Sequence, residues 1–178
     1  MANHDETTAR RLRLLQSEFI QPGRRGPSAG RTTRPTEPAA PINLGILDYM
    51  RASVDEVEQH TRAAAPNAGP RPAEVDAIYD WYREHTAHLE PEKQLHREVV
   101  IYRQGLEHAI QMGDDKAIRR HPCPACATWG LFWNAALGKA LCVNHYCTDD
   151  RGASRSWTLA YLAQQHVARQ ESSARRAT

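Results

Sequence analysis

The four cysteines of the chain all lie within 25 residues of one another. They form two close pairs: two residues separate Cys123 from Cys126, and four separate Cys142 from Cys147. The fifteen residues between the pairs are enough for a β-hairpin that brings two tight turns together. Four thiolates on two such turns match the tetrahedral ligand set of a closed structural zinc site. The spacing therefore predicts one Zn²⁺ on all four cysteines, with no coordination position open to a substrate.

Three other interpretations of the cysteines compete with a four-cysteine site. A redox-active dithiol at Cys123 and Cys126 would need a surrounding βαβ pattern, and the sequence has none there. His121 or His145 could replace one cysteine as a ligand, because one precedes the first pair and the other lies inside the second. The cysteines could also be free thiols. The sequence leaves the two histidines open as alternative ligands.

The residues around the cysteines also resemble a known pattern. Cys-Pro-x-Cys, a hairpin and Cys-x-Asn-x-x-Cys resemble the zinc ribbons of small bacterial and phage proteins, over residues 121–150. The resemblance implies bound zinc, and contact with nucleic acid or with a protein. Ala127 departs from it, because such ribbons often have glycine at this turn position. The second turn is also wider than usual.

Apolar residues before the cysteines recur at helical spacing. Three stripes, ending near Pro66, before Pro91 and near Met112, predict three antiparallel helices. In the first stripe the apolar positions are Leu47, Met50, Val54 and Val57. In the second, which is expected to start near Pro72, they are Val75, Ile78, Tyr79, Tyr82 and Leu89. In the third they are Leu95, Val99, Tyr102, Leu106 and Ile110. The predicted fold class is mainly α: a disordered N-terminal arm, a three-helix antiparallel bundle, a small β-hairpin zinc ribbon and a C-terminal helix.

The segment after the bundle is predicted in more detail. Residues 129–133 and 139–143 are expected to be strands, and the last helix is expected to begin near Ser156. The polar tail from Glu171 is expected to fray. Trp129, Trp133 and Trp157 are expected to form a small core between the hairpin, the last helix and the bundle.

Charge divides the chain into three parts that coincide with the predicted domains. Residues 1–41, a flexible basic arm and linker with a short helical stretch at 5–20, carry seven basic and four acidic side chains. The helical body, 42–115, carries fourteen acidic and seven basic. The zinc ribbon and last helix, 116–178, carry nine basic and three acidic. This asymmetry favours a polyanion near the C-terminal part, although attraction between the parts or simple solvation would explain it equally well.

Two functions from different classes follow. In the first, the protein is a regulatory zinc module that contacts nucleic acid, with cations on phosphates and aromatic rings on unpaired bases. The predicted contacts are Arg119, Arg120, Lys139, Arg151 and Arg155. In the second, the protein is an adaptor that docks a partner protein on its acidic helical face, and zinc is purely structural.

Catalysis is not expected. The sequence has no nucleophile elbow and no phosphate-binding glycine loop, so we expect neither an enzyme nor a small-molecule substrate. Three Glu–His pairs stand four residues apart, at 56/60, 84/88 and 92/96. A di-metal carboxylate bundle uses a spacing of three, so these pairs are interpreted as ordinary surface pairs.

The cellular location is predicted from two features that the sequence lacks. It contains no apolar run of membrane-spanning length, and its first residues do not resemble a secretory signal. We therefore expect no membrane partner and a cytoplasmic location, where clustered thiols stay reduced and available to a metal.

Overall fold

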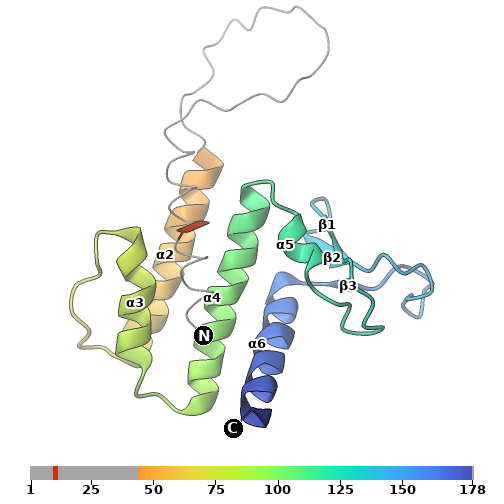
Figure 1. The fold of residues 1–178 in the computed structure, drawn as a ribbon. Coiled ribbons are helices and arrows are strands. Elements are labelled where there is room, and N and C mark those ends of the chain that lie inside the picture. The colour runs from red at the N-terminus through yellow and green to blue at the C-terminus, as the bar shows by residue number, and fades with distance from the viewer. Residues whose placement is uncertain (1–9, 12–43, 178) are drawn as a thin grey trace, which may run out of the picture.

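The structure is a computed structural model that describes residues 10–11 and 44–177 (Figure 1). This part of the chain is mainly helical, with one small antiparallel sheet. The elements in order are α2 (Leu44–Ala64), α3 (Val75–Thr86), α4 (Pro91–Gln111), α5 (Lys116–Arg119), β1 (Phe132–Asn134), β2 (Lys139–Leu141), β3 (Ser156–Trp157) and α6 (Leu159–Arg176). No helix in the described ranges is long and apolar enough to cross a membrane.

Prolines set two of the helix ends, as the sequence predicts. α2 ends two residues before Pro66, and α4 has Pro91 in its first turn, where the missing N–H costs nothing. The predicted second helix is longer than the observed one. α3 begins at Val75, three residues after Pro72, and it ends before Leu89, which therefore belongs to a loop.

The first core cluster lies among α2, α3 and α4. Its buried side chains are Met50, Val57, Ile78, Tyr79, Tyr82 and Ile101. Gln104 of α4 is fully buried beside this cluster and joins all three helices. It accepts from the Tyr79 hydroxyl at 2.9 Å and donates to the Ser53 carbonyl at 3.0 Å, so its polar atoms are paired.

The second core cluster joins the end of α4 to everything that follows it. Its buried members are Leu106, Ala109, Ala117, Ile118, Leu131, Ala140, Leu159, Leu162 and the thiols of Cys123, Cys142 and Cys147. α4 therefore contributes to both clusters and lies between α2 and α6 in Figure 1. The boundary between the helical body and the zinc ribbon, at residues 115 and 116, stays a prediction. The second core cluster contains residues from both sides of this boundary.

The last helix differs from the prediction at both ends. Residues 156–157 form β3, because they pair with β2 (Ala140 with Trp157), and Thr158 then caps α6 by accepting from the Tyr161 N–H at 3.2 Å. The tail does not fray at Glu171. An ion pair between Glu171 and Arg175 at 3.1 Å spans this stretch, and the helix runs to Arg176.

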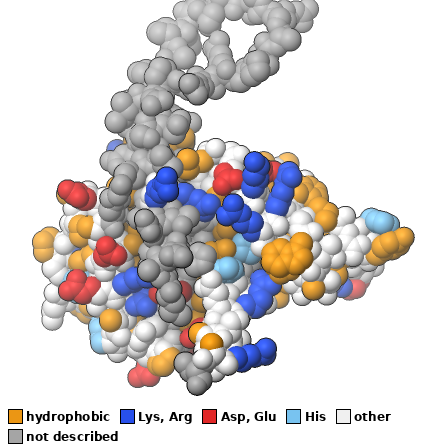
Figure 2. All heavy atoms as spheres, in the orientation of Figure 1, with side chains coloured by type: hydrophobic (Ala, Val, Ile, Leu, Met, Phe, Trp, Pro, Cys, Tyr) orange, Lys and Arg blue, Asp and Glu red, His pale blue; other side chains and the backbone are white. Residues whose placement is uncertain are grey.

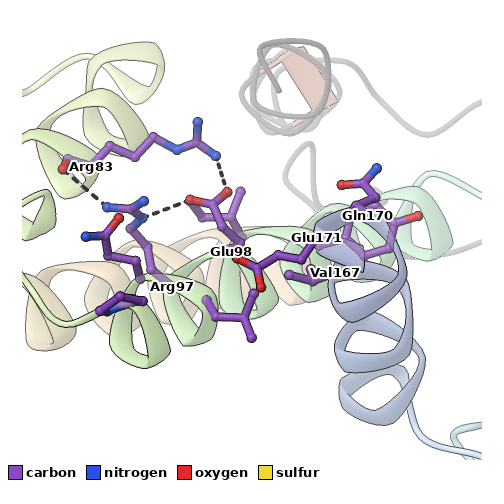
Figure 3. A pocket seen from close by; sticks show the side chains of 11 residues that line it. Arg83, Arg97, Glu98, Val167, Gln170 and Glu171 are labelled. Atoms are coloured by element: carbon purple, nitrogen blue, oxygen red, sulfur yellow. Dashed lines mark hydrogen bonds and ion pairs between the residues drawn. The ribbon is translucent and has the colours of Figure 1, made fainter. Parts of the chain in front are cut away.

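α6 lies along α4, an arrangement that the sequence does not predict. The rings of Tyr102 and His166 stack at 4.0 Å with their planes 5° apart. Toward the start of α4, a cavity of about 260 Å³ remains between the two helices. Figure 3 shows its wall, where Glu98 pairs with Arg83 and Arg97, and where Val167, Gln170 and Glu171 of α6 face it.

The sheet has the order β1-β2-β3 and is antiparallel throughout. β1 pairs Phe132 with Leu141 and Asn134 with Lys139. β1 is displaced toward the C-terminus from the predicted 129–133, because Gly130 has a φ of 106° that interrupts an extended strand. β2 is shorter than the predicted 139–143. We call residues 121–157, which contain the sheet and all four cysteines, the cysteine segment.

The N-terminal predictions lie almost wholly outside the described residues. Arg10 and Arg11 are helical, within the predicted stretch 5–20. Arg11 donates to the Gly105 carbonyl of α4 at 2.9 Å and forms an ion pair with Asp114 at 3.7 Å. At Arg11 the arm therefore lies against the body. The predicted arm and linker at 12–41 lie outside the described ranges.

Candidate metal centre

The four cysteine sulfurs converge on one point of the cysteine segment. All four lie within 4.8 Å of one another, with 3.8 Å between the Sγ atoms of Cys123 and Cys147 and 3.6 Å between those of Cys126 and Cys142. A tetrahedral Zn²⁺ with Zn–S bonds of about 2.3 Å has sulfurs about 3.8 Å apart. The geometry therefore fits a single tetrahedral ion, and all four cysteines are free of disulfides.

The first cysteine turn is closed by backbone hydrogen bonds. The Cys123 N–H donates to the Thr128 carbonyl and the Ala127 N–H donates to the Cys123 carbonyl, both at 2.9 Å. Ala127 has a φ of 58°, in the left-handed region that favours glycine. This is the position at which the sequence departs from the ribbon pattern, so the departure costs backbone strain.

Replacing Ala127 with glycine should therefore stabilise the site. Relief of the left-handed conformation is worth about 1 kcal/mol, and the greater freedom of glycine in the unfolded chain offsets part of it. We expect a higher melting temperature and slower metal loss to a chelator. Ala125→Gly, in the same turn but without a positive φ, is the control and should be neutral or slightly destabilising. Equal behaviour of the two variants would show that Ala127 is unstrained.

The second cysteine turn is fixed from two sides. The Cys147 N–H donates to the Asn144 carbonyl at 2.9 Å, and the Asn144 side chain accepts from the Tyr146 N–H at 3.1 Å. The backbone of Arg155 accepts from Cys142 N–H and donates to the Cys147 carbonyl, both at 3.0 Å. The chain leading into β3 thus holds both ends of the wider turn, which explains how four intervening residues still bring the two sulfurs together.

The thiols differ in how easily they ionise. Hydrogen bonds from the Thr128 hydroxyl and backbone N–H lower the pKa of Cys126 to about 6. Burial raises the pKa of Cys147 to about 12, with the neighbouring sulfurs adding to the shift, and burial also raises the pKa of Cys142. Without a cation, four thiolates would repel one another. A divalent ion removes this repulsion, so metal binding and deprotonation are coupled.

Burial makes the site closed. Cys123, Cys142 and Cys147 are only 2%, 3% and 7% exposed, and they belong to the second core cluster. Cys126 is half-buried and packs against the same cluster. Four protein ligands and little access for solvent characterise a structural metal site and leave no place for a reacting molecule.

The two alternative histidine ligands lie outside the cluster. His121 is buried with its Nε2 3.1 Å from the Tyr102 hydroxyl, and its ring packs edge-on against Tyr102. His145 is exposed, with its ring 3.8 Å from that of Tyr146. In the described part of the chain, the four cysteines alone form a group of three or more candidate ligands at metal-binding distance.

The five predicted nucleic-acid contacts are all exposed. Two of them have partners: Arg119 pairs with Asp115 at 3.1 Å, and Arg155 donates to the Thr148 carbonyl at 2.9 Å. Arg119 and Arg120 come from α5 and the residue after it, whereas Lys139, Arg151 and Arg155 belong to the cysteine segment. The structure thus places them on neighbouring elements.

The sequence prediction for Trp129 is wrong. Trp133 and Trp157 pack against the second core cluster as expected, but Trp129 is 66% exposed. Tyr146, from the other cysteine turn, is 83% exposed. Val143 is also exposed, and its side chain lies close to Gly130, the residue after Trp129. The sequence contains no signal for this exposure, because aromatic rings next to a metal-binding turn are expected to cover the metal site.

The fold and the site together define a mainly helical protein that carries a four-cysteine metal-binding cluster on a small antiparallel sheet. Comparisons of the chain with protein-family models, with curated proteins and with solved structures found no match.

Proposed function

We propose that the protein is a non-enzymatic module in which a zinc ribbon, carried on a helical bundle, contacts single-stranded nucleic acid in a regulatory role. The cysteine segment is the ribbon and Zn²⁺ is its ion. The observation that carries the proposal is the exposure of one large aromatic ring beside each cysteine turn, Trp129 and Tyr146.

Zinc is favoured by the chemistry of the site. Four thiolates in a closed tetrahedral arrangement select Zn²⁺ or iron among common cellular ions, and the S···S distances of 3.6 and 3.8 Å suit Zn–S bonds. A ribbon of three short strands buries little surface alone, so the ion supplies stability that its own packing cannot.

Nucleic acid is favoured by the surface around that ion. An exposed tryptophan and an exposed tyrosine are costly to leave in water, but they offer faces on which unpaired bases stack. Cations nearby provide attraction for phosphates. Figure 2 shows Lys and Arg side chains gathered where α4, α5 and the cysteine segment meet, while the tip of the segment carries hydrophobic and histidine side chains.

A binding titration with aromatic variants tests the proposal. Trp129→Ala and Tyr146→Ala should each weaken binding to a labelled oligothymidine or oligouridine by about tenfold, since one base stacked on an aromatic ring is worth about 1–3 kcal/mol. Wild-type affinity should fall steeply with salt, and duplex should bind more weakly than single strand. Fluorescence anisotropy measures each affinity.

Leu137→Ala, an exposed apolar residue at the hairpin loop, is the matched control and should bind like wild type. Metal content must be equal in all four proteins. Absence of binding to any single strand at low salt would contradict the proposal and leave the adaptor function, in which a protein partner docks on the acidic body.

A further inference from the structure

A second group of metal-ligating side chains lies at the start of α4, whereas the cysteine segment follows its end. A cavity of about 530 Å³ opens where α2 and α3 end and α4 begins. His60 of α2 and His96 of α4 line it from facing helices. Their ring centres are 5.5 Å apart and their planes are inclined by 44°. Glu92 lines the same cavity one turn before His96.

The separation of the two rings fits a shared ion. Imidazole nitrogens bind Zn²⁺ at about 2.0–2.1 Å, and the ring centre lies about 1.2 Å beyond the nitrogen. Two imidazoles on one tetrahedral ion therefore have ring centres about 5 Å apart. The observed 5.5 Å between the ring centres of His60 and His96 is close to this value.

Glu92 would supply a third donor after its side chain turns, because in this structure the donors of His60, His96 and Glu92 do not all lie within metal-binding distance of one another. Residues four apart on a helix lie on the same face, so this carboxylate can turn toward the ion that His96 binds. The Glu–His pairs do not have the spacing that a di-metal bundle needs. A single ion held by two helices has no such requirement, and only the fold shows that two of the pairs face one another.

The surroundings of the cavity are compatible with a cation. Burial lowers the pKa of His60, which keeps this imidazole in the neutral form that binds metals. Two cationic residues, Lys93 and Arg97, also line the cavity. Lys93 is exposed to solvent. The charge of Arg97 is met by Glu98 at 2.9 Å, and Arg97 donates to the Thr86 hydroxyl at 3.0 Å (Figure 3 shows the pair with Glu98). α2 and α3 both end here with their carbonyl groups, which favour positive charge, whereas the N-terminus of α4 at the same cavity opposes it.

We propose that His60, His96 and Glu92 form a second metal site, which binds one divalent transition-metal ion and leaves its remaining coordination positions to water. Two imidazoles and one carboxylate suit Zn²⁺, Co²⁺ or Ni²⁺. Unlike the cysteine site, this site is open to solvent. It is independent of the nucleic-acid proposal, because it uses neither the cysteine segment nor the exposed aromatic rings.

Cobalt titration of the full-length protein, with zinc already bound to the cysteines, tests this site. Wild type should bind one Co²⁺ without thiolate-to-cobalt absorption, which shows that the cysteines keep their first ion. Paramagnetic broadening in NMR spectra should be strongest for the His60 and His96 signals. His60→Ala and His96→Ala should each weaken Co²⁺ binding by at least about tenfold, since even partners of metal ligands contribute that much.

Two further variants separate a built site from adventitious binding. Glu92→Gln should weaken Co²⁺ binding while preserving the helix. His88→Ala, which removes an exposed histidine in the loop before α4, should leave affinity and stoichiometry unchanged. The proposal fails if wild type binds no further ion, if His88→Ala reduces binding as much as His60→Ala, or if cobalt broadens all exposed histidines alike. The NMR measurement uses wild type only, so it stays decisive even where a variant does not fold.

Discussion

Replacing Cys142 with serine should abolish stoichiometric zinc binding and unfold the cysteine segment. Cys142 is 3% exposed, and its sulfur lies 3.6 Å from that of Cys126, so the shorter and less acidic hydroxyl cannot take its place. Structural zinc contributes on the order of 10 kcal/mol to small folds that depend on it. Metal analysis and near-ultraviolet circular dichroism, which reports the packing of Trp133 and Trp157, measure the two effects.

The helical body should survive this substitution in part. The first core cluster, with Gln104 at its side, contains no residue of the cysteine segment, so α2 and α3 should keep their far-ultraviolet signal. Ala125→Ser, which places the same hydroxyl at an exposed position of the other cysteine turn, should retain both the metal and the fold. A Cys142→Ser protein that still binds one zinc per chain would contradict the four-cysteine site.

Replacing Leu162 with alanine should destabilise the protein by about 3 kcal/mol, because it leaves a cavity under a fully buried side chain of α6. Leu162 belongs to the core cluster that also contains three of the cysteine thiols. We therefore expect the substitution to weaken metal retention as well, although Leu162 is not a ligand. Urea unfolding measures the first effect, and competition with a zinc chelator measures the second.

Gln164→Ala is the matched control for this coupling, since it truncates an exposed side chain two residues further along α6. It should change neither stability nor metal affinity by much. If Leu162→Ala destabilises the helices but leaves zinc affinity at the wild-type value, the metal site and the helices fold independently. The shared core would then not couple zinc affinity to the stability of the helices.

The sequence predicted the features that local rules control. Proline fixes the start of α4 because it has no N–H to lose in a first helical turn, and apolar spacing placed α2 and α4 within a few residues. The four cysteines could be assigned to one cluster because close pairs on tight turns leave little conformational choice. These features depend on neighbours in the chain and need no knowledge of the fold.

The features that the sequence missed depend on contacts between distant residues. β3 forms because Trp157 and Ser156 pair with β2, and α6 packs on α4 through the second core cluster and the stacked rings of Tyr102 and His166. The exposure of Trp129 depends on how the first cysteine turn folds beside Pro122, and no periodic pattern records it. The approach of His60 and His96 likewise results from the packing of α2 against α4.

X-ray absorption spectroscopy of the purified protein at the zinc edge tests the central claim most directly. The claim is that four thiolates hold one ion and thereby complete the second core. We predict one zinc per chain with a first shell of four sulfurs at about 2.3 Å. A metal-free protein that is nevertheless folded, or a first shell in which nitrogen or oxygen replaces sulfur, would contradict it.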